Sequence, residues 1–389
     1  MAHKRGAIRD GGENLMKFIP YGRQSIDSSD IESVVDVLKS DYLTTGSKIP
    51  EFEEAIAKYC GVKYCVVVSS GTSALHLASL ALLEEGERVL TTPNSFLATA
   101  NSILYAKAKP IFVDIDKNGL IDLDLCEEYL KRDSSIKALY GVSFSGLMLD
   151  QDRLKALREK YNIRVLEDNA HSIGATFNGI KAGSCKNSDV SIFSFHPVKH
   201  ITTGEGGAVT TNSKEIYERV LNLRNHGMVK EPNMLPWEYE MRELGFNYRI
   251  TDFQCALGLS QLKRLDSFLD RRRELAKRYN LAFQNSRLKP LYPYNLDSAY
   301  HLFVVRYPFD SLEEKGEFFN KIRSKKIGLQ LHYIPINRQP YYKSLGYGDE
   351  DTPNMNRYYL EAFSLPIYPD LSFKEQDYVI ESLKEILEV

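Results

Sequence analysis

The sequence carries almost no net charge. Its 389 residues include 50 Lys and Arg against 52 Asp and Glu, which gives a formal net charge of −2. Proteins that bind nucleic acid normally show a basic excess over at least part of their surface. The basic run Arg271-Arg272-Arg273 lies in a helical pattern and indicates a solvated helix face. We therefore expect no nucleic-acid or other polyanionic partner.

Cysteine is scarce, and its spacing argues against a disulfide framework. The five cysteines are scattered, odd in number, and form no C-x-x-C pair. Disulfide-stabilised proteins normally carry an even set of cysteines in a short secreted chain. Free thiols in a reducing compartment are the better interpretation, and we expect the protein to be cytoplasmic.

Long apolar runs are also missing. A membrane-spanning helix needs about 20 predominantly apolar residues, but the most apolar window, residues 66–83, is interrupted by the polar stretch 69–73. We therefore expect no membrane segment. Residues 1–15 lack the apolar centre of a secretory signal. We expect them to be a disordered extension or leader, with Met16 as the natural start.

Short apolar runs alternate with amphipathic stretches in the first two thirds of the chain. Strands that alternate with helices of this length predict an α/β fold with a mostly parallel, helix-covered sheet. We expect a large domain over residues 16–270. The seven predicted strands cover residues 64–68, 88–91, 110–113, 138–142, 164–167, 189–194 and 207–211.

A second alternation begins near residue 300 and predicts a smaller C-terminal α/β domain over residues 271–389. Its expected elements are a strand at 301–307, a helix at 312–325, a strand at 328–333 and a helix from 374. Between the two alternations lies an aromatic, Pro-interrupted insert at 228–239. That insert suits a mobile loop or a cover over a site.

Ligands of parallel sheets bind beyond the carboxyl ends of the strands, and a polar turn stands at the first of these ends. Residues 69–73, Ser-Ser-Gly-Thr-Ser, separate a predicted strand from a predicted helix. Free backbone N–H groups at a helix start suit a phosphate. By itself the turn is equally well explained as a plain N-cap.

Two further strand ends carry ionisable residues. Glu167-Asp168-Asn169-Ala170-His171 follows one apolar strand, where acids could hold a metal, act as a base or neutralise a cationic ring. Residues 194–200 follow another and contain Lys199, which alone would be a surface charge. His196 and His200 have ligand-like spacing, but Pro197 disfavours a regular helix and no H-E-x-x-H pattern is present. We expect no metal site.

Together these three strand ends indicate pyridoxal phosphate (PLP). The turn at 69–73 would hold the phosphate, Asp168 would keep the pyridine nitrogen protonated, and Lys199 would bind the cofactor covalently. A protonated ring accepts electrons from a carbanion far better than a neutral one. A transaminase would cycle this cofactor between PLP and pyridoxamine phosphate (PMP).

The sequence resembles the DegT/DnrJ/EryC1/StrS sugar aminotransferases over nearly the whole chain after Phe18. This resemblance implies a fold-type I PLP-dependent transferase with a seven-stranded sheet, acting as a homodimer with shared active sites. The ordered motifs that carry it are Leu43-Thr44-Thr45-Gly46, Ser69-Ser70-Gly71-Thr72-Ser73-Ala74, residues 92–100, Glu167-Asp168-Asn169-Ala170-His171, residues 193–199, residues 202–207 and Gly245-Phe246-Asn247-Tyr248-Arg249.

The resemblance also implies roles for single residues. Lys199 matches the cofactor-binding lysine, and Asp168 matches the partner of the pyridine nitrogen. Phe96 matches an aromatic that stacks on the ring. The other matched positions are Gly71, Thr72 and Ser194 at the phosphate, His171 near the cofactor, Asn247 reaching the phosphate from the partner subunit, and His332 and Tyr333 at the substrate.

Within the family, the sequence is most similar to transaminases of the pseudaminic acid type. Residues 196–199, 201–207, 224–228 and 331–333 carry this similarity, whereas His200 stands where that group usually has proline. It implies transfer of an amino group from glutamate, which becomes 2-oxoglutarate, to C4 of a UDP-linked 4-keto-6-deoxy-N-acetylhexosamine.

Two other functions are open to a chain with this pattern, and two more are disfavoured. It could aminate another nucleotide keto sugar, such as a GDP-perosamine precursor or a 3-keto sugar. It could be a regulatory protein that holds PLP without turnover. A sugar dehydratase is disfavoured because the dehydratases resembling this family lack the lysine, and an NAD-dependent enzyme because no G-x-G-x-x-G fingerprint is present.

Overall fold

The computed structural model describes residues 17–388, so the expectations for residues 1–15 lie outside the described part. Its central sheet has seven strands in the order β1-β9-β8-β5-β4-β2-β3. β9 runs antiparallel to both of its neighbours, and every other adjacent pair is parallel. The strands are β1 (Tyr64–Val68), β2 (Arg88–Thr91), β3 (Lys109–Phe112), β4 (Ile136–Val142), β5 (Arg164–Asp168), β8 (Val190–Ser194) and β9 (Gly207–Thr211). All seven strands predicted from the sequence are confirmed.

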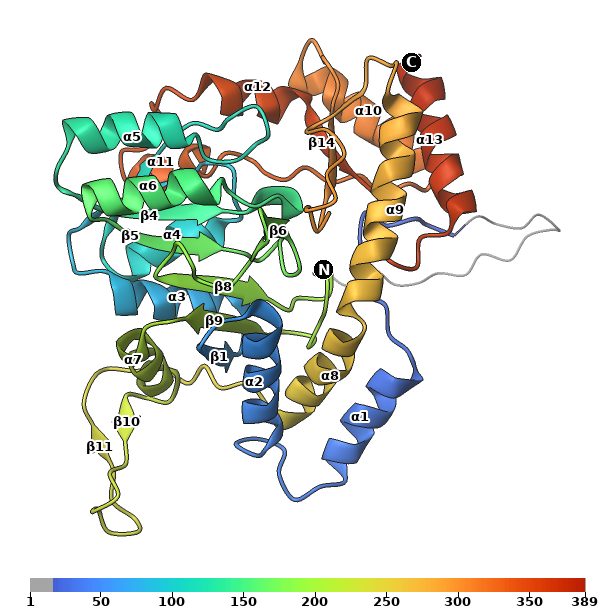
Figure 1. Cartoon of the computed structure of the whole chain (residues 1–389). Helices are drawn as coiled ribbons and strands as arrows, with labels where there is room; N and C mark the ends of the chain where they lie inside the picture. The colour runs from blue at the N-terminus through green and yellow to red at the C-terminus, as the bar shows by residue number, and fades with distance from the viewer. Residues whose placement is uncertain (1–16, 389) are drawn as a thin grey trace.

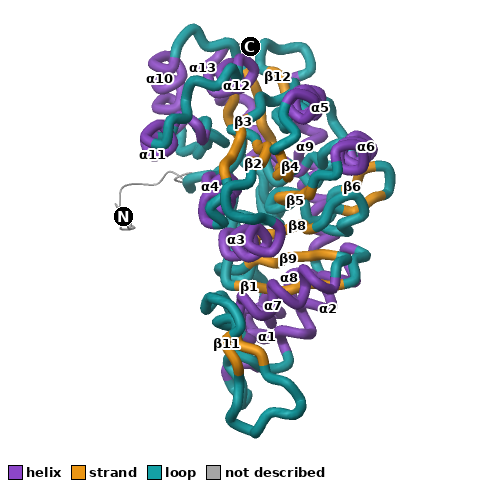
Figure 2. Tube along the Cα trace, turned by 90° about the vertical axis from the view of Figure 1, so that its left-hand side faces the viewer, coloured by secondary structure: helices purple, strands orange, loops and turns teal. Residues whose placement is uncertain are grey.

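Helices cover both faces of this sheet (Figure 2). Because side chains alternate along a strand, Val66 and Val68 pack with Leu75 on one face, whereas Cys65 and Val67 pack with Phe52 on the other. The first face is covered by α3 (Gly71–Leu82), α4 (Leu97–Tyr105) and α7 (Lys214–Arg224), the second by α2 (Lys48–Cys60), α5 (Leu123–Arg132), α6 (Gln151–Tyr161) and α8 (Asp252–Lys263).

The long helix α9 (Leu265–Phe283) runs from the region of α8 to a smaller antiparallel sheet (Figure 1). The predicted domain boundary between residues 270 and 271 falls inside this helix and stays a prediction. The smaller sheet comprises β12 (Lys289–Pro290), β13 (Phe303–Arg306) and β14 (Ala362–Leu365), and around it lie α10 (Leu312–Ser324), α12 (Pro353–Glu361) and α13 (Phe373–Leu387). The short helix α11 (Pro340–Ser344) packs instead against α4 and β3 of the large sheet.

The strand predicted at residues 328–333 is wrong. This segment forms only an isolated bridge, between Gln330 and Ser364. The Tyr358 hydroxyl donates to the backbone oxygen of His332 at 2.6 Å, and the His332 ring contacts the Ser364 hydroxyl at 2.9 Å. Side-chain contacts hold the segment in place of a strand ladder, and its residues 330–333 line a cavity.

The insert expected to be a loop or cover is a β-hairpin. β10 (Met228–Val229) pairs with β11 (Glu240–Met241), and the hairpin projects away from the body of the molecule (Figures 1 and 2). Trp237 at its tip region is 74% exposed, and Tyr239 and Met241 are also exposed. A projecting arm with exposed aromatic and apolar side chains is typical of a contact surface.

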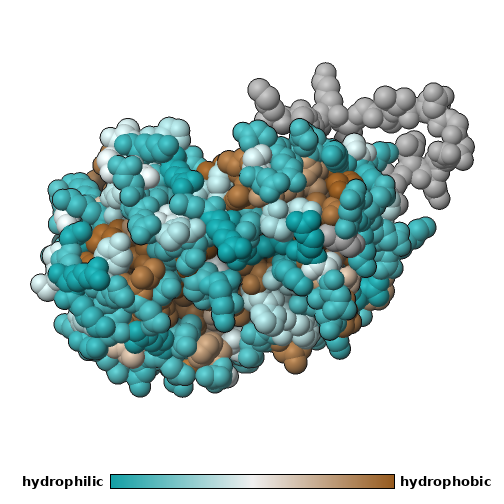
Figure 3. Space-filling view, turned by 90° about the horizontal axis from the view of Figure 1, so that it is seen from above, coloured by the Kyte–Doolittle hydropathy of each residue, from teal (hydrophilic) through white to brown (hydrophobic). Residues whose placement is uncertain are grey.

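The face of the molecule seen from above is mainly hydrophilic, with hydrophobic residues in separate spots (Figure 3). Within residues 17–388, no helix has the length and apolar content that crossing a bilayer requires. The remaining elements are α1 (Ser28–Leu38) and the short pair β6 (Thr176–Phe177) and β7 (Ile180–Lys181).

Arg272 corrects the expectation of a solvated helix face for residues 271–273. Its side chain is wholly buried in the middle of α9. One terminal nitrogen donates to three backbone oxygens, those of Tyr300 and His301 at 3.2 Å and of Ile367 at 2.9 Å. The sequence pattern did not predict this burial because the sequence does not show whether an arginine is exposed or bound to carbonyl groups.

Replacing Arg272 should destabilise the fold. Arg272→Met removes a charged donor from three buried carbonyl groups, and we expect a loss of about 2 kcal/mol or more, read as a lowered melting temperature in calorimetry. Lys277→Met, at an exposed position of the same helix, is the control and should change stability by no more than about 0.5 kcal/mol. Equal melting temperatures for the two variants would contradict this role of Arg272.

Candidate active site

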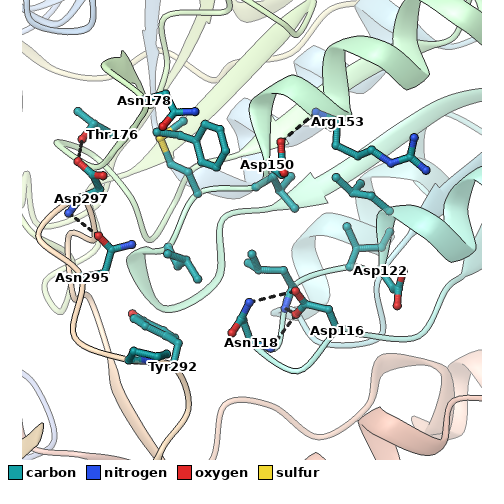
Figure 4. A pocket seen from close by; sticks show the side chains of 18 of the residues that line it. Asp116, Asn118, Asp122, Asp150, Arg153, Thr176, Asn178, Tyr292, Asn295 and Asp297 are labelled. Carbon is teal, nitrogen blue, oxygen red and sulfur yellow. Dashed lines mark hydrogen bonds between the residues drawn. The ribbon is translucent and has the colours of Figure 1, made fainter.

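Several hollows compete as the functional site, and size does not decide among them. One, of about 840 Å³, lies between the segments 116–124, 147–153, 176–178 and 292–297 (Figure 4). Its polar groups bind one another: Asn118 donates to Asp116, and Thr176 donates to Asp297. Of the unpartnered buried polar side-chain atoms within residues 17–388, none lines this hollow. Nothing there marks a ligand.

A smaller cavity, of about 500 Å³, lies at the carboxyl ends of the strands and contains Lys199 and Asp168. The structure therefore brings together the strand ends singled out in the sequence. Nine of the ten expected site residues line it: Gly71, Thr72, Phe96, Asp168, His171, Ser194, Lys199, His332 and Tyr333.

Asn247 is the exception. It is exposed, forms an isolated bridge with Asn225 near the base of the hairpin, and does not line the cavity.

The polar turn after β1 forms the start of α3. Ser70 caps the helix, and its hydroxyl accepts the N–H of Ser73 at 3.0 Å. The first N–H groups of a helix have no intrahelical partner, so those of Gly71 and Thr72 are available to a ligand at the positive end of the helix dipole. A Cβ on residue 71 would lie 2.8 Å from the Cβ of Ser194. Glycine is required there because β8 passes so close.

Asp168 ends β5 and is buried, 4% exposed. One carboxylate oxygen accepts from the Thr99 hydroxyl at 2.6 Å, and the other accepts from the Ala170 N–H at 3.1 Å. Burial raises the pKa of Asp168, while these hydrogen bonds and the charge on Lys199 oppose that shift. The carboxylate makes no hydrogen bond with Lys199, so it can still bind a cationic ligand.

Lys199 lies in the turn that follows β8, where its N–H donates to the His196 oxygen at 2.8 Å. Burial of the side-chain amine lowers the pKa of Lys199 to about 8, and Asp168 partly opposes this. A lysine with a lowered pKa has a larger neutral fraction near physiological pH and is therefore a better nucleophile.

His171 and Tyr333 form one wall of the cavity. Their side chains contact each other at 3.1 Å, and the Ser145 N–H donates to the other ring nitrogen of His171 at 3.3 Å. Burial lowers the pKa of His171 well below its ordinary value and raises that of Tyr333. Both groups are therefore neutral at physiological pH.

Phe96 stands at the mouth of the cavity, immediately before α4. Its side chain is 59% exposed, although it lines the cavity, and its ring centroid lies 6.2 Å from that of Tyr333. A large aromatic residue that is exposed at a cavity mouth can cover the face of a flat ligand.

Among the cavity residues that were not singled out from the sequence, three contact the expected site residues. Thr99 lies one helical turn after Phe96, and its spacing from Phe96 was the available signal. His301 lines the cavity next to His171, with ring centroids 4.3 Å apart, and Tyr21 packs edge-on against His332 at 5.2 Å. Tyr21 and His301 come from distant parts of the chain, so no local pattern connects them with the site.

The assembled site can bind a phosphate, hold a cationic ring against a carboxylate and attack a carbonyl with an amine. Residues 24–384 match the DegT/DnrJ/EryC1/StrS aminotransferase family. The chain belongs to this family, as its sequence motifs predicted.

Similar proteins cover nearly the entire chain. A UDP-4-amino-4,6-dideoxy-N-acetyl-beta-L-altrosamine transaminase of Campylobacter jejuni is 41% identical, over 95% of this chain and 98% of its own. Helicobacter pylori PseC, an aminotransferase of pseudaminic acid biosynthesis, is a solved structure with a TM-score of 0.90 and 31% identity, over 96% of this chain and 100% of its own. A sugar aminotransferase from Streptococcus pneumoniae, solved in its PLP form, has a TM-score of 0.87 and 30% identity, over 95% and 99%.

The lowered pKa of Lys199 predicts how its reactivity depends on pH. Only the neutral amine reacts with an amine-selective reagent, so in cofactor-free protein the labelling rate of Lys199 should rise with pH and reach half its maximum near pH 8. An unperturbed lysine, with a pKa near 10.4, would still be gaining reactivity at about pH 10. Trinitrobenzenesulfonate labelling read by peptide mass spectrometry measures this, and a midpoint near the unperturbed value would contradict the desolvation of Lys199.

Proposed function

We propose that this chain is a PLP-dependent aminotransferase that moves the amino group of glutamate to C4 of a UDP-linked 4-keto-6-deoxy-N-acetylhexosamine. The observation that carries the chemistry is the pair Asp168 and Lys199, a buried carboxylate and a desolvated amine in one cavity without a hydrogen bond between them.

The residues present fit the cofactor. The N–H groups of Gly71 and Thr72 and the hydroxyl of Ser194 suit its phosphate, and a side chain at residue 71 would fill the close approach to Ser194. Asp168 suits the protonated ring nitrogen, and Phe96 can cover the ring face. When bound, PLP supplies an electron sink for the carbanion at the reacting carbon.

Lys199 acts twice in this proposal. Its neutral amine first holds the cofactor, and after displacement by the amino donor it moves a proton as general acid and base at Nζ. Asp168 keeps its charge through Thr99 and the Ala170 N–H, which stabilises positive charge on the ring nitrogen. Burial of both groups strengthens their electrostatic effect by excluding water.

The sugar substrate rests on similarity. The Campylobacter jejuni relative is named for an altrosamine-type UDP sugar, and the Helicobacter pylori structure for pseudaminic acid biosynthesis. His200, which departs from that group, is buried and contacts the Ala299 oxygen at 3.0 Å behind the site. His200 does not line the cavity, so the difference from that group at this position leaves the lining unchanged.

The five cysteines are free and buried, which supports a reducing, cytoplasmic location.

The test follows cofactor and product together. Glutamate should convert the holoenzyme to its PMP form, and a panel of UDP- and GDP-linked 4-keto and 3-keto sugars should then restore the PLP spectrum only with the UDP-linked 4-keto-6-deoxy-N-acetylhexosamine, with product mass confirming one added amine. Lys199→Ala should abolish both turnover and the lysine-bound absorbance. Conversion of a 3-keto sugar alone would overturn the substrate assignment, and an active Lys199→Ala variant would overturn the chemistry.

We further propose a homodimer in which each subunit completes the site of the other. Asn247 is exposed outside its own cavity, next to the hairpin that carries the exposed Trp237 and Met241. More exposed apolar residues lie on and after α1 and around α4: Ile31, Val35, Leu38, Tyr42, Leu43, Phe96, Leu97 and Tyr105. Exposed apolar groups of this size are typical of an interface.

Mixed dimers test the shared site. Lys199→Ala and Asn247→Ala homodimers should each lose most activity. In a mixed dimer the two substitutions would fall in the same site and leave the other site intact. With random pairing about half of the dimers are mixed, so co-expression should restore up to about a quarter of wild-type activity. Wild-type activity in Asn247→Ala homodimers, or no recovery on mixing, would contradict a shared site.

A further inference from the structure

The hydrogen bonds of His171 determine which of its nitrogens carries the proton. A backbone N–H can only donate, so the Ser145 N–H requires Nδ1 of His171 to be an acceptor. A neutral imidazole carries one proton, and His171 is neutral because burial lowers its pKa. Nε2 therefore holds that proton and donates it to the Tyr333 hydroxyl oxygen, 3.1 Å away.

This arrangement leaves the hydroxyl hydrogen of Tyr333 unused by His171. The bond with His171 is the one hydrogen bond that the Tyr333 hydroxyl makes within residues 17–388. Tyr333 is half-buried and lines the same cavity as Lys199. Burial and the charge on Asp168 raise the pKa of Tyr333, so the hydroxyl keeps its hydrogen and can present it to an oxygen in the cavity.

Neighbouring rings keep His171 in place. His301 packs against it at 4.3 Å between ring centroids, and His200 lies 5.5 Å behind His301. His200 is in turn held by its contact with the Ala299 oxygen. The ring of His171 is packed on one side and hydrogen-bonded at both nitrogens. The hydrogen bond that the Tyr333 oxygen accepts from His171 is therefore in place before any ligand binds.

We propose that Tyr333 donates a hydrogen bond to the carbonyl oxygen of the keto substrate, and that His171 is the positioning residue that turns its hydroxyl hydrogen into the cavity. This inference rests on the proposed function, because it takes the acceptor to be a ketone. The bond polarises the carbonyl group and stabilises the negative charge that develops on oxygen when an amine attacks the carbon. Tyr333 lies beside Phe96 at the mouth, the side from which a substrate enters.

The first experiment needs neither cofactor nor substrate. In cofactor-free protein labelled with ¹⁵N-histidine, the His171 signals are identified by their loss in His171→Gln. The hydrogen-bond geometry requires Nε2 to carry the proton and Nδ1 to carry none. We expect this tautomer throughout about pH 6 to 8, a range that includes the ordinary histidine pKa of about 6.5. A proton on Nδ1 would overturn the positioning role, whatever the enzyme's substrate is.

The second experiment measures single turnovers of the PMP form with the keto sugar. Tyr333→Phe should slow conversion by about 100-fold or more and change the sugar concentration for half-saturation much less. His171→Ala should slow it partly, and His171→Gln, whose amide can still donate to Tyr333, should recover most of the rate. Tyr341→Phe makes the same chemical change at a 64% exposed tyrosine outside the cavity and is the control.

The outcomes separate the two proposals. If wild-type protein converts no keto sugar, the proposed substrate fails, while the ¹⁵N result still tests His171. If wild-type protein turns over and Tyr333→Phe matches it, the role of Tyr333 is overturned and the aminotransferase function stands. A Tyr333→Phe variant that changes only the cofactor spectrum would assign the hydroxyl to the cofactor and also overturn the inference.

Discussion

The site depends on keeping a carboxylate and an amine in one cavity without a hydrogen bond between them. A contact pair of opposite charges is worth about 4 kcal/mol at an effective dielectric constant of 20, enough to raise the pKa of Lys199 again and to remove most of its neutral, reactive fraction. Thr99 and the Ala170 N–H each donate to one oxygen of Asp168 and hold the carboxylate in place, while further acceptor sites stay available to a cationic ligand. The two groups still affect each other's pKa through space, which keeps Asp168 ionised and Lys199 only moderately shifted.

The central sheet could be predicted from the sequence because its strands are short apolar runs separated by helical patterns. β5 and β8 end at the polar residues that were singled out, since the carboxyl ends of parallel strands share one edge of a sheet. Gly71 was recognised as part of a turn. Its close approach to Ser194, which excludes any side chain, depends on packing between segments more than a hundred residues apart and left no local signal.

Other features could not be predicted from sequence patterns. Residues 328–333 alternate like a strand, but tertiary contacts of His332 hold them as an irregular cavity wall. His301 lies 130 residues after His171 and meets it only in the folded chain. Arg272 looked like an exposed charge because sequence gives charge but not the carbonyl groups that surround it.

The position of Arg272 limits how the protein can move. α9 passes from the large sheet to the small one (Figure 1), and Arg272 ties it to Tyr300, His301 and Ile367 at that passage. A hinge here would have to break three hydrogen bonds of a buried cation. Bending at this point would also displace His301, which supplies one of these carbonyl groups and lines the cavity beside His171. The stability of the fold and the shape of the cavity therefore depend on the same buried cation.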